Sequence, residues 1–82
     1  MSDSKQLYNF EVWALYDHPS DYPDVYIARR FVALPNPPRI VATVDVVQSK
    51  DLNVVRAQMS RKGLARVERL PQDDAKIIET WL

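Results

Sequence analysis

Apolar residues alternate with polar ones in several separate stretches of the chain, a period typical of β-strands. Residues 7–16 form the first such stretch, and 39–47 form another. Between them, residues 25–34 are apolar on both faces except for one arginine on each face. In the stretch 39–47, we expect the apolar side to face the core: Ile40, Ala42, Val44 and Val46.

The pattern changes to helical spacing over residues 50–62. Ser49 is the residue type preferred as a helix N-cap, and Asp51 falls in the first turn, where the helix dipole favours an anion. Gly63, the single glycine of the chain, is placed where a helix ends in the left-handed conformation. The sequence therefore predicts a helix near 50–62 with a narrow apolar stripe: Leu52, Val55 and Met59.

Two short strands, 64–70 and 76–82, are predicted after the helix, with a turn at 71–74 between them. Short connections favour antiparallel neighbours. The element order βββαββ predicts an α+β fold, an antiparallel sheet of four to five strands with one α-helix on one face. The chain is expected to be a single small domain, 1–82, with 1–6 frayed. The predicted core is Phe10, Val12, Ile27 or Phe31, Val44, Leu52, Val55, Met59, Val67 and Ile77.

Composition narrows the class of protein. The 82 residues carry a formal net charge of zero, which argues against a general nucleic-acid binder. Cysteine is absent, and one glycine excludes most glycine-rich nucleotide-binding loops. No apolar stretch reaches the length of a membrane span, and residues 1–6 do not resemble a signal peptide. We expect a soluble cytoplasmic protein that does not associate with membranes.

The turn at 16–24 holds two prolines and an unusual density of polar groups, including Asp17, His18, Asp21 and Asp24. A catalytic triad needs groups that converge from separate segments, so we interpret the aspartates as caps of the turn. The spacing also lacks the glycine and terminal glutamate of a calcium loop. No catalytic, cofactor-binding or metal-ligating residue is assigned, and no cofactor is expected. A small enzyme or metal site in the 17–30 hairpin stays an alternative.

Arg29 and Arg30 point to opposite faces of the second predicted strand. We expect Glu11 to pair across the hairpin with one of them. The other is expected to be free or to face a partner, with Glu68, Glu79 or an aspartate of the turn as internal alternatives.

A second candidate surface is basic and runs from the predicted helix into the following strand. Its members are Arg56, Arg61, Lys62, Arg66 and Arg69. They could contact phosphates, but no nucleic-acid-binding motif accompanies them. A nucleic-acid-associated protein using this 56–69 face is therefore the first alternative, and a solvated face is the favoured interpretation.

The doubly apolar strand 25–34 suggests that one helix cannot cover both of its faces, so an exposed patch is expected near Trp13 and either Tyr26 or Ile27. This pattern favours a non-enzymatic protein–protein interaction module, either a homodimer or a protein docked on a larger one. The expected interaction surface is Trp13, Asp17, His18, Asp21, Tyr22, Tyr26, Arg29 and Arg30.

Four segments, 12–19, 21–24, 28–31 and 77–82, together resemble a group of small uncharacterised bacterial and phage proteins. The group carries a similar YD-P-DYPD…ARR hairpin and a similar ending with glutamate and tryptophan. The resemblance covers nearly the whole chain. It implies a bacterial or phage cytoplasmic protein, and it brings no activity, cofactor or catalytic residue.

Overall fold

A computed structural model describes residues 11–68 and 75–82. These residues form five strands and one helix in the order β1 (Glu11–Asp17), β2 (Tyr26–Pro35), β3 (Pro38–Ser49), α2 (Leu52–Arg61), β4 (Arg66–Glu68) and β5 (Ile77–Trp81). The strands make one antiparallel sheet in the order β3-β2-β1-β5-β4. The predicted α+β class, with a five-stranded antiparallel sheet and one helix, is confirmed. The predicted turn at 71–74 lies outside the described residues.

Local interactions at both ends of α2 explain where the helix begins and ends. The N-cap is Asp51, whose side chain accepts a hydrogen bond from Asn53 N at 2.9 Å. The predicted cap, Ser49, is wrong, because it is the last residue of β3 and accepts from Asp51 N instead. Gly63 has φ of +82°, so its prediction as the left-handed terminator is confirmed.

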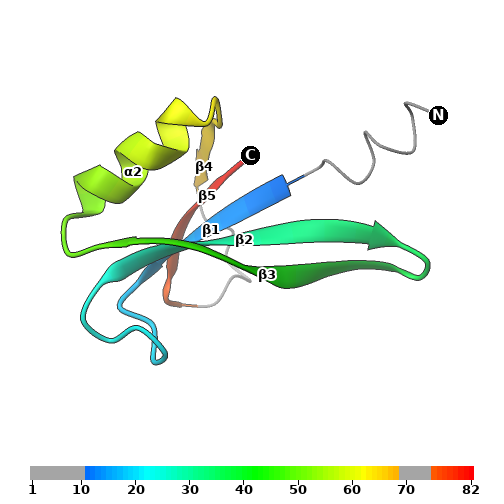
Figure 1. Cartoon of the computed structure of the whole chain (residues 1–82), viewed down its shortest axis with the longest axis horizontal. Helices are drawn as coiled ribbons and strands as arrows, with labels where there is room; N and C mark the ends of the chain where they lie inside the picture. The colour runs from blue at the N-terminus through cyan, green and yellow to red at the C-terminus, as the bar shows by residue number, and fades with distance from the viewer. Residues whose placement is uncertain (1–10, 69–74) are drawn as a thin grey trace.

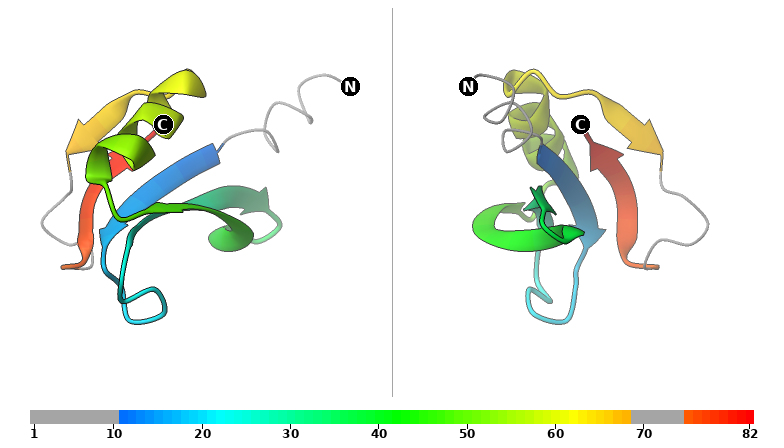
Figure 2. Two further views of the ribbon diagram at one scale, coloured as in Figure 1. Left: turned by 60° about the vertical axis from the view of Figure 1, so that its left-hand side comes forward. Right: turned by 90° about the vertical axis from the view of Figure 1, so that its right-hand side faces the viewer.

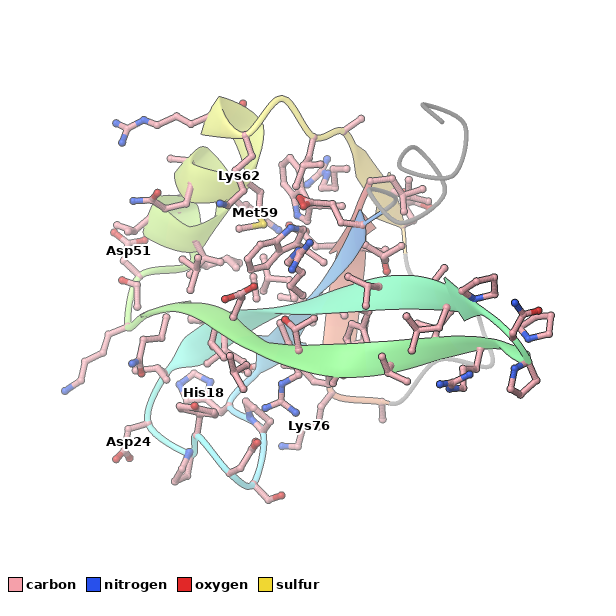
Figure 3. All side chains as sticks on the ribbon, turned by 45° about the vertical axis from the view of Figure 1, so that its right-hand side comes forward. His18, Asp24, Asp51, Met59, Lys62 and Lys76 are labelled. Carbon is pink, nitrogen blue, oxygen red and sulfur yellow. The ribbon has the colours of Figure 1, made fainter. Side chains whose placement is uncertain are left out.

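The helix α2 lies to one side of the sheet (Figures 1 and 2). The strand register puts Leu15 opposite Ala28, and Trp13 opposite Trp81, so these four side chains share one face of the sheet. Val55 and Met59 come down from α2 onto that face, and all six are buried in one cluster. Figure 3 shows Met59 pointing from the helix towards the sheet. This helix-covered face is the core, and Leu52 packs at its edge.

The opposite face of the sheet differs in burial from one end to the other. Ile27 lies on it, opposite Tyr16, and is fully buried. The expected patch near Trp13 and the 26/27 pair is therefore wrong, because Trp13 is only 3% exposed and Tyr26 packs against the core. Val67 was expected in the core, but it is 42% exposed on this opposite face. Phe10, another expected core residue, lies outside the described residues.

Strand β3 is an edge strand with an irregular register. Arg29 pairs with Val46 and Phe31 pairs with Ala42, so residues 43–45 all lie opposite Arg30. Thr43 fixes this bulge, since its hydroxyl donates to Arg30 O at 3.2 Å and accepts from Asp45 N at 3.1 Å.

The bulge changes which side chains of β3 are covered. Val44 sits at its centre and is 94% exposed, so its predicted place in the core is wrong. Ile40 lies opposite Ala33 on the face away from α2, and it is 63% exposed rather than inward-facing. Val47, which lies opposite Ala28, is the residue of β3 that packs against the core.

The far end of the β2–β3 hairpin projects beyond the rest of the sheet (Figure 1). We call residues 33–40 the arm. Its two strands pair through Ala33–Ile40 and Leu34–Arg39. Residues 35–40 are all exposed. An isolated two-stranded ribbon is marginally stable in water, so an arm of this kind is best stabilised by contacts on its sides.

Candidate functional sites

The polar turn between β1 and β2 is held by contacts among its own residues. His18 has φ of 51°, in the left-handed region, and its Nδ1 lies 2.5 Å from an Asp17 carboxylate oxygen. Its ring meets the Tyr26 ring edge-on, with centroids 4.8 Å apart. Figure 3 shows His18 and Asp24 on this turn. Asp17 and His18 thus bind one another, as expected of a turn that is locked by its side chains.

Glu11 accepts a hydrogen bond from Arg30 Nε at 3.2 Å, which confirms the predicted pair across the hairpin. Arg30 also binds Asp45 on β3 at 3.0 Å, so its guanidinium joins three strands. Arg29 is the remaining arginine, so the expectation that this side chain is free or partner-facing is wrong, and the internal alternative, an aspartate of the turn, is correct. It is bound to Asp21 of the turn and lies 5.5 Å from the centre of the Tyr16 ring. Both arginines are therefore occupied by groups of the chain itself.

Trp13 is buried by the end of the helix, which corrects its expected place on an interaction surface. Its indole Nε1 donates to Glu11 at 3.1 Å. Lys62 lies over the ring, with Nζ 4.9 Å from the centroid. The ammonium group is thus within the range of a cation–π interaction with the indole face.

The predicted basic patch is only partly available for a partner. Arg56 Nε and Nη2 donate to the two carboxylate oxygens of Glu79 at 3.1 and 2.9 Å. Arg66 lies 3.7 Å from the same carboxylate. Lys62 lies over the Trp13 ring. Among the described members of the patch, this leaves Arg61 as the one side chain without an ion pair or ring contact within residues 11–68 and 75–82. Arg69 lies outside the described residues.

Glu79 is the one charged side chain buried among the described residues, at 3% exposed. Besides the two arginines, it accepts a hydrogen bond from Trp81 Nε1 at 2.9 Å. The hydrogen bond to Glu79 raises the pKa of Arg56, although burial acts in the opposite direction. In the sequence, Glu79 was expected only as a possible partner of one of the β2 arginines. The clearer signal was its position between Ile78 and Trp81 in an apolar strand.

A polar cavity of about 360 Å³ lies beside this ion pair, lined by Arg56, Arg66, Glu68, Ile78 and Glu79. Two cations and two carboxylates face it, so its formal charge is balanced. Glu79 already accepts from Nε and Nη2 of Arg56 and neutralises its charge, so the cavity has little net attraction for an anion. The cavity is better explained as the open side of a structural ion pair than as a ligand site.

The face of the sheet away from α2 carries a hollow of about 400 Å³. We call it the apolar groove. It is lined by Val12, Ala14, Phe31, Ile40, Val67, Glu68, Ile77, Thr80 and Leu82. Ile40 belongs to the edge strand β3, and Val67 and Glu68 belong to the other edge strand, β4. Residues from both edges of the sheet can line one hollow only if the sheet curls around it, as twisted sheets do.

The apolar groove was missed in the sequence because its members come from all five strands. Ile40, Val67 and Leu82 are among the large hydrophobic side chains that the structure leaves most exposed, and all three line it. Clusters of exposed apolar side chains mark binding surfaces more often than scattered single ones do. The groove is therefore the strongest candidate for a recognition surface.

Comparison of the chain with protein-family models, with curated proteins and with solved structures gave no match. The resemblance to the bacterial and phage group stays a prediction. Within residues 11–68 and 75–82, no three His, Asp or Glu side chains are grouped so that they could hold a metal ion. In the same part of the chain, no helix has the length and apolar character needed to cross a membrane.

Proposed function

We propose that this protein is a non-enzymatic protein–protein interaction module, and that its recognition surface is the apolar groove on the face of the sheet away from α2. The observation that carries the proposal is the clustering of Ile40, Val67 and Leu82, all at least 42% exposed, around one apolar hollow. Burying such a surface against a partner is favourable by roughly 25 cal/mol per Å² of apolar area.

The polar turn, the β2 arginines and the basic patch are weaker candidates for a binding site than the apolar groove. Arg29 binds Asp21 of the turn, and Arg30 binds Glu11 and Asp45 on the neighbouring strands. Two of the basic helix–strand residues, Arg56 and Arg66, bind Glu79. A phosphate backbone would have to compete with these contacts for the same guanidinium groups. The groove, by contrast, offers side chains that remain in contact with solvent.

Val67→Asp tests the proposal, because it places a charge in the groove at a position that is already partly exposed. Val54→Asp is the matched control, since Val54 has a similar exposure, 44%, but lies on the helix. Fluorescently labelled wild-type protein and the two variants would be examined by sedimentation velocity, both purified and in an extract of the cells from which the protein comes.

Wild type and Val54→Asp are expected to sediment as a species heavier than one chain, alone or in the extract. Val67→Asp is expected to sediment as a single chain in both. If wild type sediments as a single chain under both conditions, the interaction function is wrong. If Val67→Asp keeps the heavier species, the groove is not its surface.

A further inference from the structure

Strand β2 runs past the point where its neighbour β1 begins, and this part of β2 belongs to the arm (Figure 1). Glu11, the first described residue of β1, lies opposite Val32, whereas β2 continues to Pro35. Among the described residues, Ala33 and Leu34 pair with β3 alone. The arm therefore has an open edge that continues the line of β1.

We infer that this edge is occupied by residues 7–10 of the same chain, which lie outside the described residues, and that Phe10 forms one end of the apolar groove. The inference deepens the proposed function, and its consequence for binding rests on that function. The apolar alternation of the sequence, which begins at residue 7 and continues through β1, is the pattern that a strand along this edge needs.

The register of the β1–β2 hairpin assigns a partner to each added residue. Each step back along β1 moves its partner on β2 one step forward. Phe10 then lies opposite Ala33, and Asn9 lies opposite Leu34. Regular pairing ends at Pro35, because proline has no N–H to donate. Since residue 10 is bonded directly to Glu11, no loop has to be closed, and this favours the chain's own segment over a second molecule.

The alternation of side chains along a strand gives Phe10 its place in the groove. Phe10 shares a face with Val12 and Ala14, which both line the apolar groove. On that face Ala33 stands between Phe10 and Ile40, which are two strand spacings, roughly 10 Å, apart. The small alanine leaves room for the two larger side chains to meet over it. Phe10 thus covers one side of Ile40, which is 63% exposed among the described residues.

A pair of introduced thiols can report this contact, because the chain has no cysteine of its own. Asn9→Cys/Leu34→Cys puts two thiols opposite one another on the face away from the groove, within reach of a disulfide. With oxidised glutathione as the oxidant, the purified variant is expected to form a disulfide within one chain. Mass spectrometry detects it as the loss of two hydrogens at the mass of a single chain.

Asn9→Cys/Ala33→Cys is the matched control, because its thiols are one position out of register and point to opposite faces of the sheet. It is expected to keep its thiols free or capped by glutathione. Circular dichroism checks that both variants keep the fold. Equal disulfide formation in the two variants, or none in Asn9→Cys/Leu34→Cys, would overturn the contact. A disulfide that joins two chains would assign the edge to a second copy and would also overturn it.

The role of Phe10 in recognition is tested separately by sedimentation, under the two conditions used for Val67→Asp. Phe10→Asp is expected to lose the heavier species, whereas Asn9→Asp, with the same added charge on the other face, keeps it. If Phe10→Asp keeps the heavier species and Val67→Asp loses it, Phe10 is not part of the groove, and the proposed function stands. If wild type gives no heavier species, the proposed function and the binding role of Phe10 both fail, and the disulfide alone decides the contact.

Discussion

Arg56 and Glu79 form a two-point ion pair that joins the helix to strand β5, with N–O distances of 3.1 and 2.9 Å. Glu79 is 3% exposed, whereas the Arg56 side chain is 35% exposed. Glu79 also accepts from Trp81 Nε1, so both of its oxygens are satisfied. The pair thus fixes the position of α2 over the sheet at a point where the apolar cluster ends.

Glu79→Ala is expected to lower the free energy of unfolding by about 3 kcal/mol. The substitution leaves Arg56 and Trp81 without their shared acceptor in a partly buried place. Glu79→Gln keeps the shape and one acceptor oxygen, and its loss should be smaller, about 1–2 kcal/mol. Urea denaturation at one low protein concentration measures both, so that association does not contribute.

The control for this prediction is Asp24→Ala, since Asp24 is exposed and has no ion pair recorded among the described residues. Its effect should stay within about 0.5 kcal/mol. If Glu79→Ala costs no more than Asp24→Ala, the ion pair is not part of what holds the helix.

The raised pKa of Arg56 fixes the pH dependence of the pair on the alkaline side. A cation whose folded pKa is raised contributes stability below its ordinary pKa and loses it only as pH rises through the folded value. For an arginine, the pH range in which this stability is lost lies above the mildly alkaline range. The difference in stability between wild type and Arg56→Ala is therefore expected to stay constant from neutral to mildly alkaline pH, measured by thermal melting in matched buffers. A steep loss in that range would contradict the assignment.

Met59→Ala is expected to cost about 2–5 kcal/mol, because Met59 is fully buried between α2 and the sheet. Leu52 is only half-buried at the edge of the cluster, so Leu52→Ala should cost less. Val54→Ala on the exposed side of the same helix serves as the control and should cost under about 1 kcal/mol. Chemical denaturation gives all three values, and the reverse order would mean that a different helix face is buried.

The elements of this fold could be predicted from the sequence where the local pattern and the local chemistry agree. The helical spacing of Leu52, Val55 and Met59 predicted the buried stripe, and Gly63 predicted the end of the helix. Both are local signals, set by a few neighbouring residues. A pair between Glu11 and one of the two arginines could be predicted, because strands that follow one another in the chain usually lie side by side.

The face of β3 could not be predicted, because a bulge shifts its register. Thr43 fixes the bulge by a bond to Asp45 N of its own strand and by one to Arg30 O of β2, and the second bond depends on the neighbouring strand. An alternation read without the bulge puts Val44 in the core, whereas the structure exposes it. A single slip in register exchanges the two faces of a strand.

The candidate site could not be predicted for a related reason. Both the groove and the burial of Trp13 depend on which strands are neighbours and on which face the helix covers. Trp13 was expected on an exposed patch, yet its register partner Trp81 and the helix residue Met59 bury it. No pattern within β1 alone distinguishes its two apolar faces.

Gly63→Ala is expected to lower the free energy of unfolding by about 1 kcal/mol. A Cβ at this position would have no atom within 4 Å, so the whole cost comes from the φ of +82°. Gly63→Asn should cost less, because asparagine tolerates the left-handed region better than alanine does. Equal losses for the two variants in denaturant titrations would point to a cause other than backbone strain.

Asp51→Ala is expected to cost about 1 kcal/mol through loss of the N-cap. The Asp51 carboxylate accepts from Asn53 N at 2.9 Å, and no other acidic residue lies in the first turn of the helix. Ser49→Ala removes only the hydrogen bond to Asp51 N, which belongs to the connection and not to the helix, so its loss should be about half as large. Asp51→Asn keeps an acceptor oxygen and should recover most of the stability. Thermal melts followed at the helical signal in circular dichroism compare the three variants. If Ser49→Ala proves the more damaging substitution, Ser49 would be the functional cap, and the helix would start earlier in solution than Leu52.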